Sequence, residues 1–175
     1  VCRRLIAGTS NPGVVQFAAK WFQNLSILRF FFYRSFLRRN ADKYQYVFLT
    51  DLRDVAFQAD PFRDVARDEL RVFLEEPWLR QGKDVNSCRW LSELFGEEIV
   101  RQLADTTLIC SGTIIGDSQR MQEYLDVFML ALSRARSVMR MGMDQGLHNY
   151  LLYSGLIDGV TMCPNRASEV LTMGL

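Results

Sequence analysis

A cluster of charged residues directly follows an apolar segment in the first third of the chain. Residues 46–50 (YVFLT) are apolar or β-branched without polar alternation, a pattern typical of a strand covered on both faces. Asp51, Arg53 and Asp54 come next. Two carboxylates beside an arginine suit a hard divalent cation with a phosphorylated ligand, because such cations take oxygen ligands from carboxylates, phosphates and water.

The same cluster also has a purely structural interpretation. Asp51 and Asp54 are three apart, so on a regular strand they would face opposite sides, and they converge only if the chain turns after Thr50. Asp51 could instead cap a helix, with Asp54 at the third helical position and Arg53 in an ion pair. The residues by themselves leave both interpretations open.

A second group of polar residues lies on a helix predicted over 144–153. Asp144 and His148 are four apart and share one face, while Gln145 and Asn149 share the adjoining face, so all four side chains can point into one cleft. The chain has a single histidine. It either binds a metal or a diphosphate, or it is a structural residue that hydrogen-bonds to Asp144.

A glycine interrupts the apolar segment over 107–115, which predicts a buried strand. At Ser111, Gly112 and Thr113 the missing side chain would let a ligand approach the backbone closely. The alternative is a strand bulge in which the two hydroxyl side chains bond locally.

The four cysteines are scattered and include no CxxC pair; they are Cys2, Cys88, Cys110 and Cys163. With one histidine in the chain, the cysteines give almost no support to a zinc site. Cys110 with His148 and either Asp144 or Asn149 would form the triad of a cysteine hydrolase. The apolar strand pattern around this thiol argues against that hypothesis.

Apolar spacing predicts the elements that must position these residues. We expect a turn-rich loop over 8–13, a helix in two pieces over 14–39, strands over 46–50, 72–74 and 107–115, a helix over 90–103 interrupted by Gly96, a long amphipathic helix over 119–140 and a last helix over 144–153. Alternating strands and helices predict an α/β sandwich, in which ligands bind beyond the carboxyl ends of the strands. The loop over 8–13 lacks the P-loop pattern.

Composition limits the class of protein. The 175 residues are 49% hydrophobic with no repeat or linker, so we expect a single domain over 1–175, and a first residue other than Met suggests a piece of a longer chain. The net charge of +1 gives no reason to expect nucleic acid as a partner. No apolar run approaches the roughly 18 residues that a membrane helix needs.

Four strings resemble, in the same order, the motifs of a family of nucleotide-diphospho-sugar glycosyltransferases with the GT-A-type fold. They are LRFFFYR (28–34), LTDLRDVAFQADPF (49–62), CSGTIIG (110–116) and DQGLHN (144–149). The resemblance covers most of the chain. It implies a three-layer sandwich with a mixed, mostly parallel central sheet and helices on both faces. It also implies sugar transfer from a nucleoside-diphosphate donor to an acceptor hydroxyl, with Mn²⁺ or Mg²⁺.

The resemblance also implies roles for individual residues. Asp54 is the expected metal ligand and Asp51 its partner, although DLRD departs from a strict DxD motif and leaves their order open; His148 is a further candidate ligand. Asp144 and Asp51 are the expected catalytic residues, with Asp144 as a base in an inverting enzyme. The residues expected to contact the donor are Arg29, Arg34, Arg53, Ser111, Gly112, Thr113, Gln145 and Asn149. Residues 60–62 are expected to form the turn that closes the loop.

The main alternative is a non-catalytic carbohydrate-binding or interaction module of the same fold. The nature of the acceptor, whether glycan, lipid or protein, stays open. The compartment of this soluble domain also stays open: it is either the cytoplasm or, if a membrane anchor lies outside this stretch, the Golgi lumen.

Overall fold

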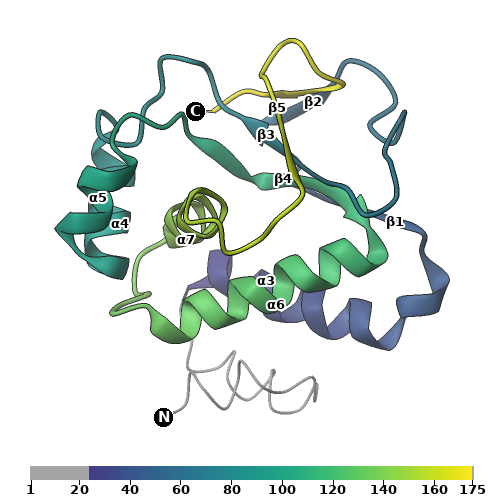
Figure 1. The fold of residues 1–175 in the computed structure, drawn as a ribbon, viewed down its shortest axis with the longest axis horizontal. Coiled ribbons are helices and arrows are strands. Elements are labelled where there is room, and N and C mark those ends of the chain that lie inside the picture. Colours follow the sequence, from purple (N-terminus) through teal and green to yellow (C-terminus); the bar gives the residue numbers. More distant parts are fainter. Residues whose placement is uncertain (1–23, 175) are drawn as a thin grey trace.

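The computed structural model describes residues 24–174, so the loop predicted over 8–13 and the first part of the helix predicted over 14–39 lie outside the described residues. The structure is mixed α/β (Figure 1). In chain order its elements are α3 (Leu25–Arg39), a 3₁₀ turn (Ala41–Lys43), β1 (Tyr46–Thr50), β2 (Val55–Phe57), β3 (Leu70–Leu74), α4 (Val85–Phe95), α5 (Glu97–Leu103), β4 (Ile109–Asp117), α6 (Ser118–Arg134), α7 (Met143–Tyr153), β5 (Val160–Cys163) and β6 (Val170–Thr172).

Four strands form the central sheet, in the order β1-β4-β3-β5. Within residues 24–174, β4 pairs antiparallel with both β1 and β3, and only β3 and β5 pair in parallel. The sheet is mixed, as expected, but the expectation of mostly parallel pairing is wrong, because β4 returns between two strands that run the other way. Since β1 and β3 share one direction, their carboxyl ends meet at the same edge of the sheet.

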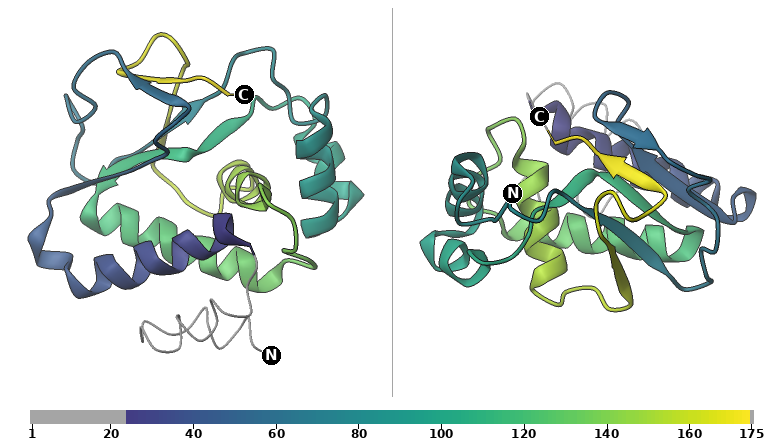
Figure 2. Two further views of the ribbon diagram at one scale, coloured as in Figure 1. Left: turned by 180° about the vertical axis from the view of Figure 1, so that it is seen from behind. Right: turned by 90° about the horizontal axis from the view of Figure 1, so that it is seen from above.

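The two faces of the sheet carry different layers. Alternate residues point to opposite faces, so Val72 and Ile114 join the large core under α3, α6 and α7, while Phe73 and Ile115 join a smaller core on the other side. Val170 of β6 belongs to this smaller core, and β6 pairs antiparallel with β2. Within residues 24–174, helices therefore cover one face and the β2–β6 pair covers the other (Figure 2), which corrects the expectation of helices on both faces.

The strand over 46–50 has the predicted bounds and contributes side chains to both cores. It is half-buried throughout, because in the described sheet it pairs on one side only. The more buried strand is β4, which lies between two neighbours. An apolar pattern reports how the faces of a strand are covered and does not distinguish an edge strand from a central one.

Two predicted helices differ in their bounds. The stretch predicted over 90–103 begins earlier, at Val85. The break predicted at Gly96 is confirmed: this residue has φ +102° and separates α4 from α5. The helix predicted over 119–140 ends at Arg134, because Ala135 is extended and the Arg136 N–H donates to the Leu94 carbonyl at 2.8 Å. The chain then crosses to the start of α7.

Three short strands, β2, β5 and β6, have no counterpart in the sequence-based prediction. Each has three or four residues, too few to show a period. The turn predicted at residues 60–62 is confirmed, since the Phe62 N–H donates to the Asp60 carboxylate at 2.9 Å.

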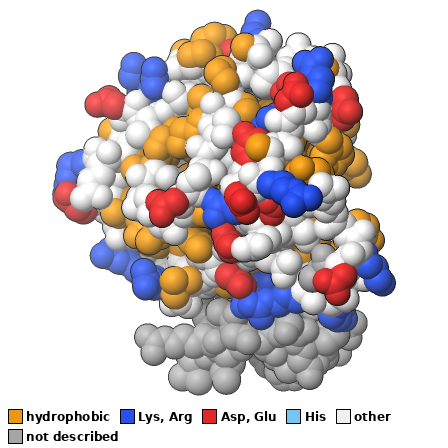
Figure 3. All heavy atoms as spheres, turned by 45° about the vertical axis from the view of Figure 1, so that its right-hand side comes forward, with side chains coloured by type: hydrophobic (Ala, Val, Ile, Leu, Met, Phe, Trp, Pro, Cys, Tyr) orange, Lys and Arg blue, Asp and Glu red, His pale blue; other side chains and the backbone are white. Residues whose placement is uncertain are grey.

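The outer surface carries both signs of charge. On the face drawn in Figure 3, acidic and basic side chains are interspersed. Within residues 24–174, no helix combines the length and the apolar character needed to cross a membrane.

Candidate functional site

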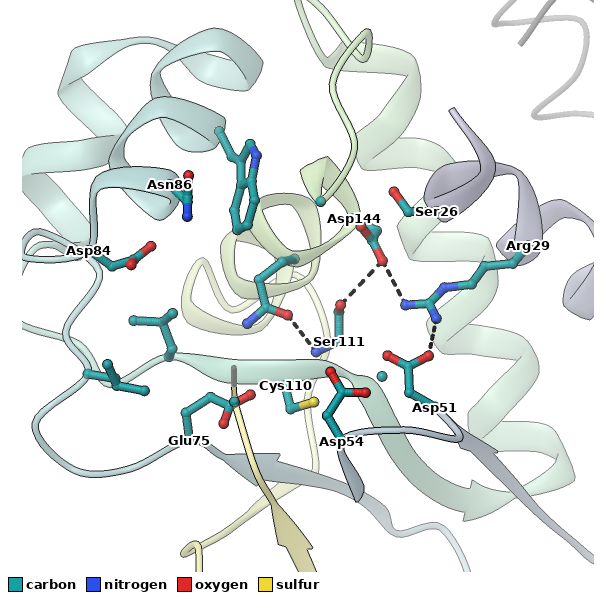
Figure 4. Close-up of a pocket in the computed structure, with 17 residues that line it drawn as sticks. Ser26, Arg29, Asp51, Asp54, Glu75, Asp84, Asn86, Cys110, Ser111 and Asp144 are labelled. Atoms are coloured by element: carbon teal, nitrogen blue, oxygen red, sulfur yellow. Dashed lines mark hydrogen bonds and ion pairs between the residues drawn. The ribbon is translucent and has the colours of Figure 1, made fainter. Parts of the chain in front are cut away.

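A cavity of about 460 Å³ opens at the carboxyl ends of β1 and β3 (Figure 4). It brings together side chains from α3, β4, α7 and the segment after β1. Those of the sequence-predicted residues that line it are Arg29, Asp51, Asp54, Ser111, Gly112, Asp144 and Gln145. Each of the four strings that resemble the family motifs therefore contributes at least one residue to this cavity. The predicted residues that do not line it are described below.

The acidic segment turns immediately after β1. The Asp51 N–H donates to the Gly112 carbonyl at 2.7 Å, residues 52–54 form a bend, and the Asp54 carbonyl accepts from the Met173 N–H at 2.9 Å. No helix begins at Asp51, so the helix-cap interpretation is wrong. The bend places both carboxylates on the same cavity, which a regular strand could not do.

Arg29 of α3 joins two carboxylates from distant parts of the chain. Its guanidinium forms ion pairs with Asp51 and, at 2.7 Å, with Asp144. Burial by itself would lower the pKa of Arg29, but the charges of Asp144 and Asp51 raise it above its ordinary value. The Arg29 guanidinium therefore links the carboxylate after β1 to the carboxylate of α7 across the cavity (Figure 4).

Gly112 makes room for Asp51. A Cβ atom at this position would lie 2.0 Å from Asp51 Oδ2, so any side chain would displace that carboxylate. Ser111 also serves the cavity, since its hydroxyl donates to Asp144 Oδ2 at 3.3 Å. Thr113 does not: it is fully buried and its hydroxyl bonds locally, to the thiol of Cys110.

Hydrogen bonds fasten α7 to the start of β4. The Asn149 amide both accepts from the Ile109 N–H at 2.8 Å and donates to the Ile109 carbonyl at 2.9 Å. Gln145 Nε2 donates to the same carbonyl at 2.8 Å, and its Oε1 accepts from the Ser111 N–H at 2.8 Å. Asn149 is fully buried and lies outside the cavity lining, whereas Gln145 lines it.

His148 is not part of the cavity. It is fully buried, and its Nδ1 lies 2.7 Å from the Tyr124 hydroxyl. Burial lowers the pKa of the imidazole to about 3, so it is neutral at physiological pH. The structure places this residue in the core between α6 and α7 and does not bring it to Asp51 or Asp54 as a metal ligand.

Two of the arginines expected to contact the donor also lie elsewhere. Arg34 forms an ion pair with Asp126 of α6. Arg53 is exposed in the bend and lies outside the cavity lining. Of the three candidate arginines, Arg29 is the one that the fold brings to the site.

Glu75 lines the cavity and was missed by the sequence analysis. Its carboxylate accepts from the Thr172 hydroxyl at 2.9 Å, and burial raises its pKa above the ordinary value. The signal was available, because Glu75 directly follows β3 just as Asp51 directly follows β1. Ser26 of α3 and Trp90 of α4 also line the cavity without having been singled out.

Cys110 lines the cavity, but its thiol is a poor nucleophile. Burial raises its pKa to about 12, and the negative charge of Glu75 adds to this. Because the thiolate is the reactive form, a thiol that stays protonated at neutral pH gives no support to a cysteine hydrolase. His148, the base that such a triad needs, is bonded to Tyr124 instead.

The cavity offers the oxygen ligands that Mn²⁺ or Mg²⁺ prefers, from Asp51 and Asp54. In the part of the chain that the structure describes, no group of three or more His, Cys, Asp or Glu side chains is arranged to hold a metal ion. Two carboxylates fit a cation that would take its remaining ligands from phosphate and water.

We compared the chain with family models, with curated proteins and with solved structures, and none of the three comparisons found a match.

Proposed function

We propose that this chain is a metal-dependent glycosyltransferase domain that moves a sugar from a nucleoside-diphosphate donor to an acceptor hydroxyl. One observation carries the proposal: Asp51 and Asp54, at the end of β1, line the same cavity as Ser111 and Gly112 of β4 and Asp144 of α7. Acidic ligands for a cation and polar groups for a sugar thus lie side by side, as the resemblance in the sequence implies.

In this proposal Asp51 and Asp54 would hold Mn²⁺ or Mg²⁺ together with the donor diphosphate. A bound cation neutralises the charge that develops on a departing diphosphate. Arg29 supplies a fixed positive charge at the same end of the cavity. The oxygen of the acceptor hydroxyl forms a bond to the anomeric carbon of the sugar, and the bond from that carbon to the phosphate oxygen breaks. The electron pair leaves with the diphosphate.

Asp144 binds the sugar or the acceptor in this proposal. Its carboxylate is almost fully buried and already accepts from Arg29 and Ser111, so these contacts hold it as a hydrogen-bond acceptor at the cavity. A carboxylate in this state accepts readily from a sugar hydroxyl. In an inverting reaction it also takes the proton that the acceptor hydroxyl loses.

The test is a calorimetric titration of UDP and GDP, with and without MnCl₂, into the wild type, Asp54→Asn and Asp64→Asn. Asp64 is a matched control, because it makes the same isosteric change at a highly exposed carboxylate outside the cavity. We expect metal-dependent binding of one nucleotide by the wild type and the control, weakened at least about tenfold in Asp54→Asn, which corresponds to about 1.4 kcal/mol.

Absence of nucleotide binding by folded wild-type protein with and without the metal would overturn the proposal. If the nucleotide binds, incubation with the matching nucleotide-sugars and measurement of released nucleoside diphosphate tests for chemistry. Binding without transfer or donor hydrolysis would favour the non-catalytic carbohydrate-binding module instead.

A further inference from the structure

A second hollow, of about 660 Å³, adjoins the candidate site. We call it the Trp78 groove and define it by Gln58, Glu76, Trp78, Arg166, Leu171 and Met173. Leu79 and Gly174 line both hollows, so a ligand that lies in the groove can reach the cavity past these two residues. No residue of the groove was predicted as a site residue from the sequence, although Gln58 lies within the string over 49–62.

The groove exposes a tryptophan on a rigid support. Trp78 is 66% exposed. It lies in a tight turn closed by a hydrogen bond of 2.8 Å from the Leu79 N–H to the Glu76 carbonyl, and Pro77 has its φ fixed by its ring. Tryptophan is highly buried on average, since its large apolar surface is costly to leave in water. A turn that holds the indole outward favours a role in binding.

An ion pair flanks the exposed indole. Arg166 Nε donates to the Glu76 carboxylate at 2.6 Å, and the guanidinium carbon lies 6.0 Å from the centre of the Trp78 ring. A guanidinium has five N–H donors and a carboxylate has about four lone-pair sites, so a pair joined in this way keeps capacity for further hydrogen bonds. The two charges cancel, and the groove presents donors and acceptors without a net charge.

The geometry points to a neutral glycan as the ligand of the Trp78 groove. One face of a pyranose ring carries mainly C–H groups and suits an exposed indole, while its hydroxyls both donate and accept, as the Glu76–Arg166 pair does. A nucleoside phosphate fits less well: among the described residues that line the groove the one basic side chain is Arg166, and Glu76 already neutralises it. The inference rests on the proposed function in one respect: it makes this glycan the acceptor.

The experiment measures glycan binding without any nucleotide. Neutral oligosaccharides built from glucose, mannose, xylose or N-acetylglucosamine are titrated into the protein and followed by saturation-transfer NMR. We expect the wild type to bind at least one of them. Trp78→Ala should weaken that binding about tenfold or more, Trp78→Phe should weaken it less because an aromatic face remains, and Leu130→Ala, which removes an exposed apolar side chain on α6, should leave it unchanged.

The outcomes separate this inference from the proposed function. Asp54→Asn should keep glycan binding while losing metal-dependent nucleotide binding, and Trp78→Ala should show the reverse. If the folded wild type binds none of the oligosaccharides, or if Trp78→Ala binds them as well as the wild type, the inference is wrong whatever the nucleotide titrations show. If Trp78→Ala instead weakens UDP or GDP binding, the groove holds the nucleobase and the inference is again overturned.

Discussion

At the scale of single residues, Gly112 determines how close Asp51 can approach β4. Because a Cβ atom would collide with the carboxylate, we expect Gly112→Ala to displace Asp51 and disturb its ion pair with Arg29. The free energy of unfolding should fall by about 1–3 kcal/mol, the usual cost of overpacking. Metal-dependent nucleotide binding should fall more than tenfold (about 1.4 kcal/mol), measured by calorimetry beside a thermal melt.

Gly155 is the matched control for this change. It has φ +64° but open space around its Cβ position, so Gly155→Ala should cost about 1 kcal/mol through backbone strain alone. Nucleotide binding should stay at the wild-type level. Equal binding by the wild type and Gly112→Ala would show that Asp51 does not depend on this close approach.

His148 makes stability depend on pH. In the unfolded chain its pKa is close to the ordinary 6.5, whereas burial lowers it to about 3 in the folded chain. Between these values the unfolded state binds more protons, so the contribution of His148 is complete above about pH 6.5 and is lost as the pH falls toward 3. This single group adds a slope of up to about 1.4 kcal/mol per pH unit.

His148→Gln removes the titrating group and keeps a side chain able to hydrogen-bond to Tyr124. Urea unfolding at pH 7.5 and pH 4.5 should show a larger loss of stability on acidification for the wild type than for the variant. Carboxylates titrate in both proteins and cancel in the comparison. Equal losses would contradict the assignment of a buried, neutral imidazole.

At the scale of elements, the contact between α7 and β4 determines the shape of the cavity. Asn149 hydrogen-bonds to both backbone groups of Ile109. Gln145, one turn earlier in the helix, adds a second hydrogen bond to the Ile109 carbonyl. The start of α7 depends on Gly142, which has φ +82° and packs so closely on Trp90 that a Cβ atom would lie 2.3 Å from its ring. Together these contacts hold Asp144 at the cavity.

We expect Asn149→Ala to destabilise the fold by about 1–3 kcal/mol, because it removes the side chain that accepts from the buried Ile109 N–H, whereas the Ile109 carbonyl keeps its bond from Gln145. Gln145→Ala should cost less, since Gln145 is only partly buried. Urea titration of both variants measures the difference. If Asn149→Ala lost less stability than Gln145→Ala, the hydrogen bonds between Asn149 and Ile109 would not be the main contact that holds α7 in place.

At the scale of the whole molecule, ligand binding should stabilise the folded chain. At a nucleotide concentration of about 100 times Kd, binding adds about 2.7 kcal/mol, which for a chain of this size raises Tm by roughly 5 to 11 °C. We expect this shift in the wild type with UDP or GDP and MnCl₂, measured by a thermal melt. In Asp54→Asn the shift should be much smaller at the same concentrations, and equal shifts would show that Asp54 does not hold the ligand.

Local patterns were sufficient to predict several parts of this fold. The strand over 46–50 and the break at Gly96 are confirmed, because side-chain period and a glycine act on the backbone within a few residues. The rule that ligands bind beyond the carboxyl ends of strands indicated Asp51 and Asp54, and applied to β3 it would have indicated Glu75. Helical geometry also separates Arg29 from Arg34, since residues five apart lie on different faces.

The tertiary structure alone decided which of the candidate residues meet. Arg29 and Asp144 are 115 positions apart in the sequence and form an ion pair, while Asp144 and His148, four positions apart, face different surroundings. The sequence indicated the polar face of α7 but not that α6 would bury His148 against Tyr124. The directions of the strands were also not predictable from local patterns. β4 lies antiparallel between β1 and β3 because of contacts between distant segments, and the local period of side chains does not depend on such contacts.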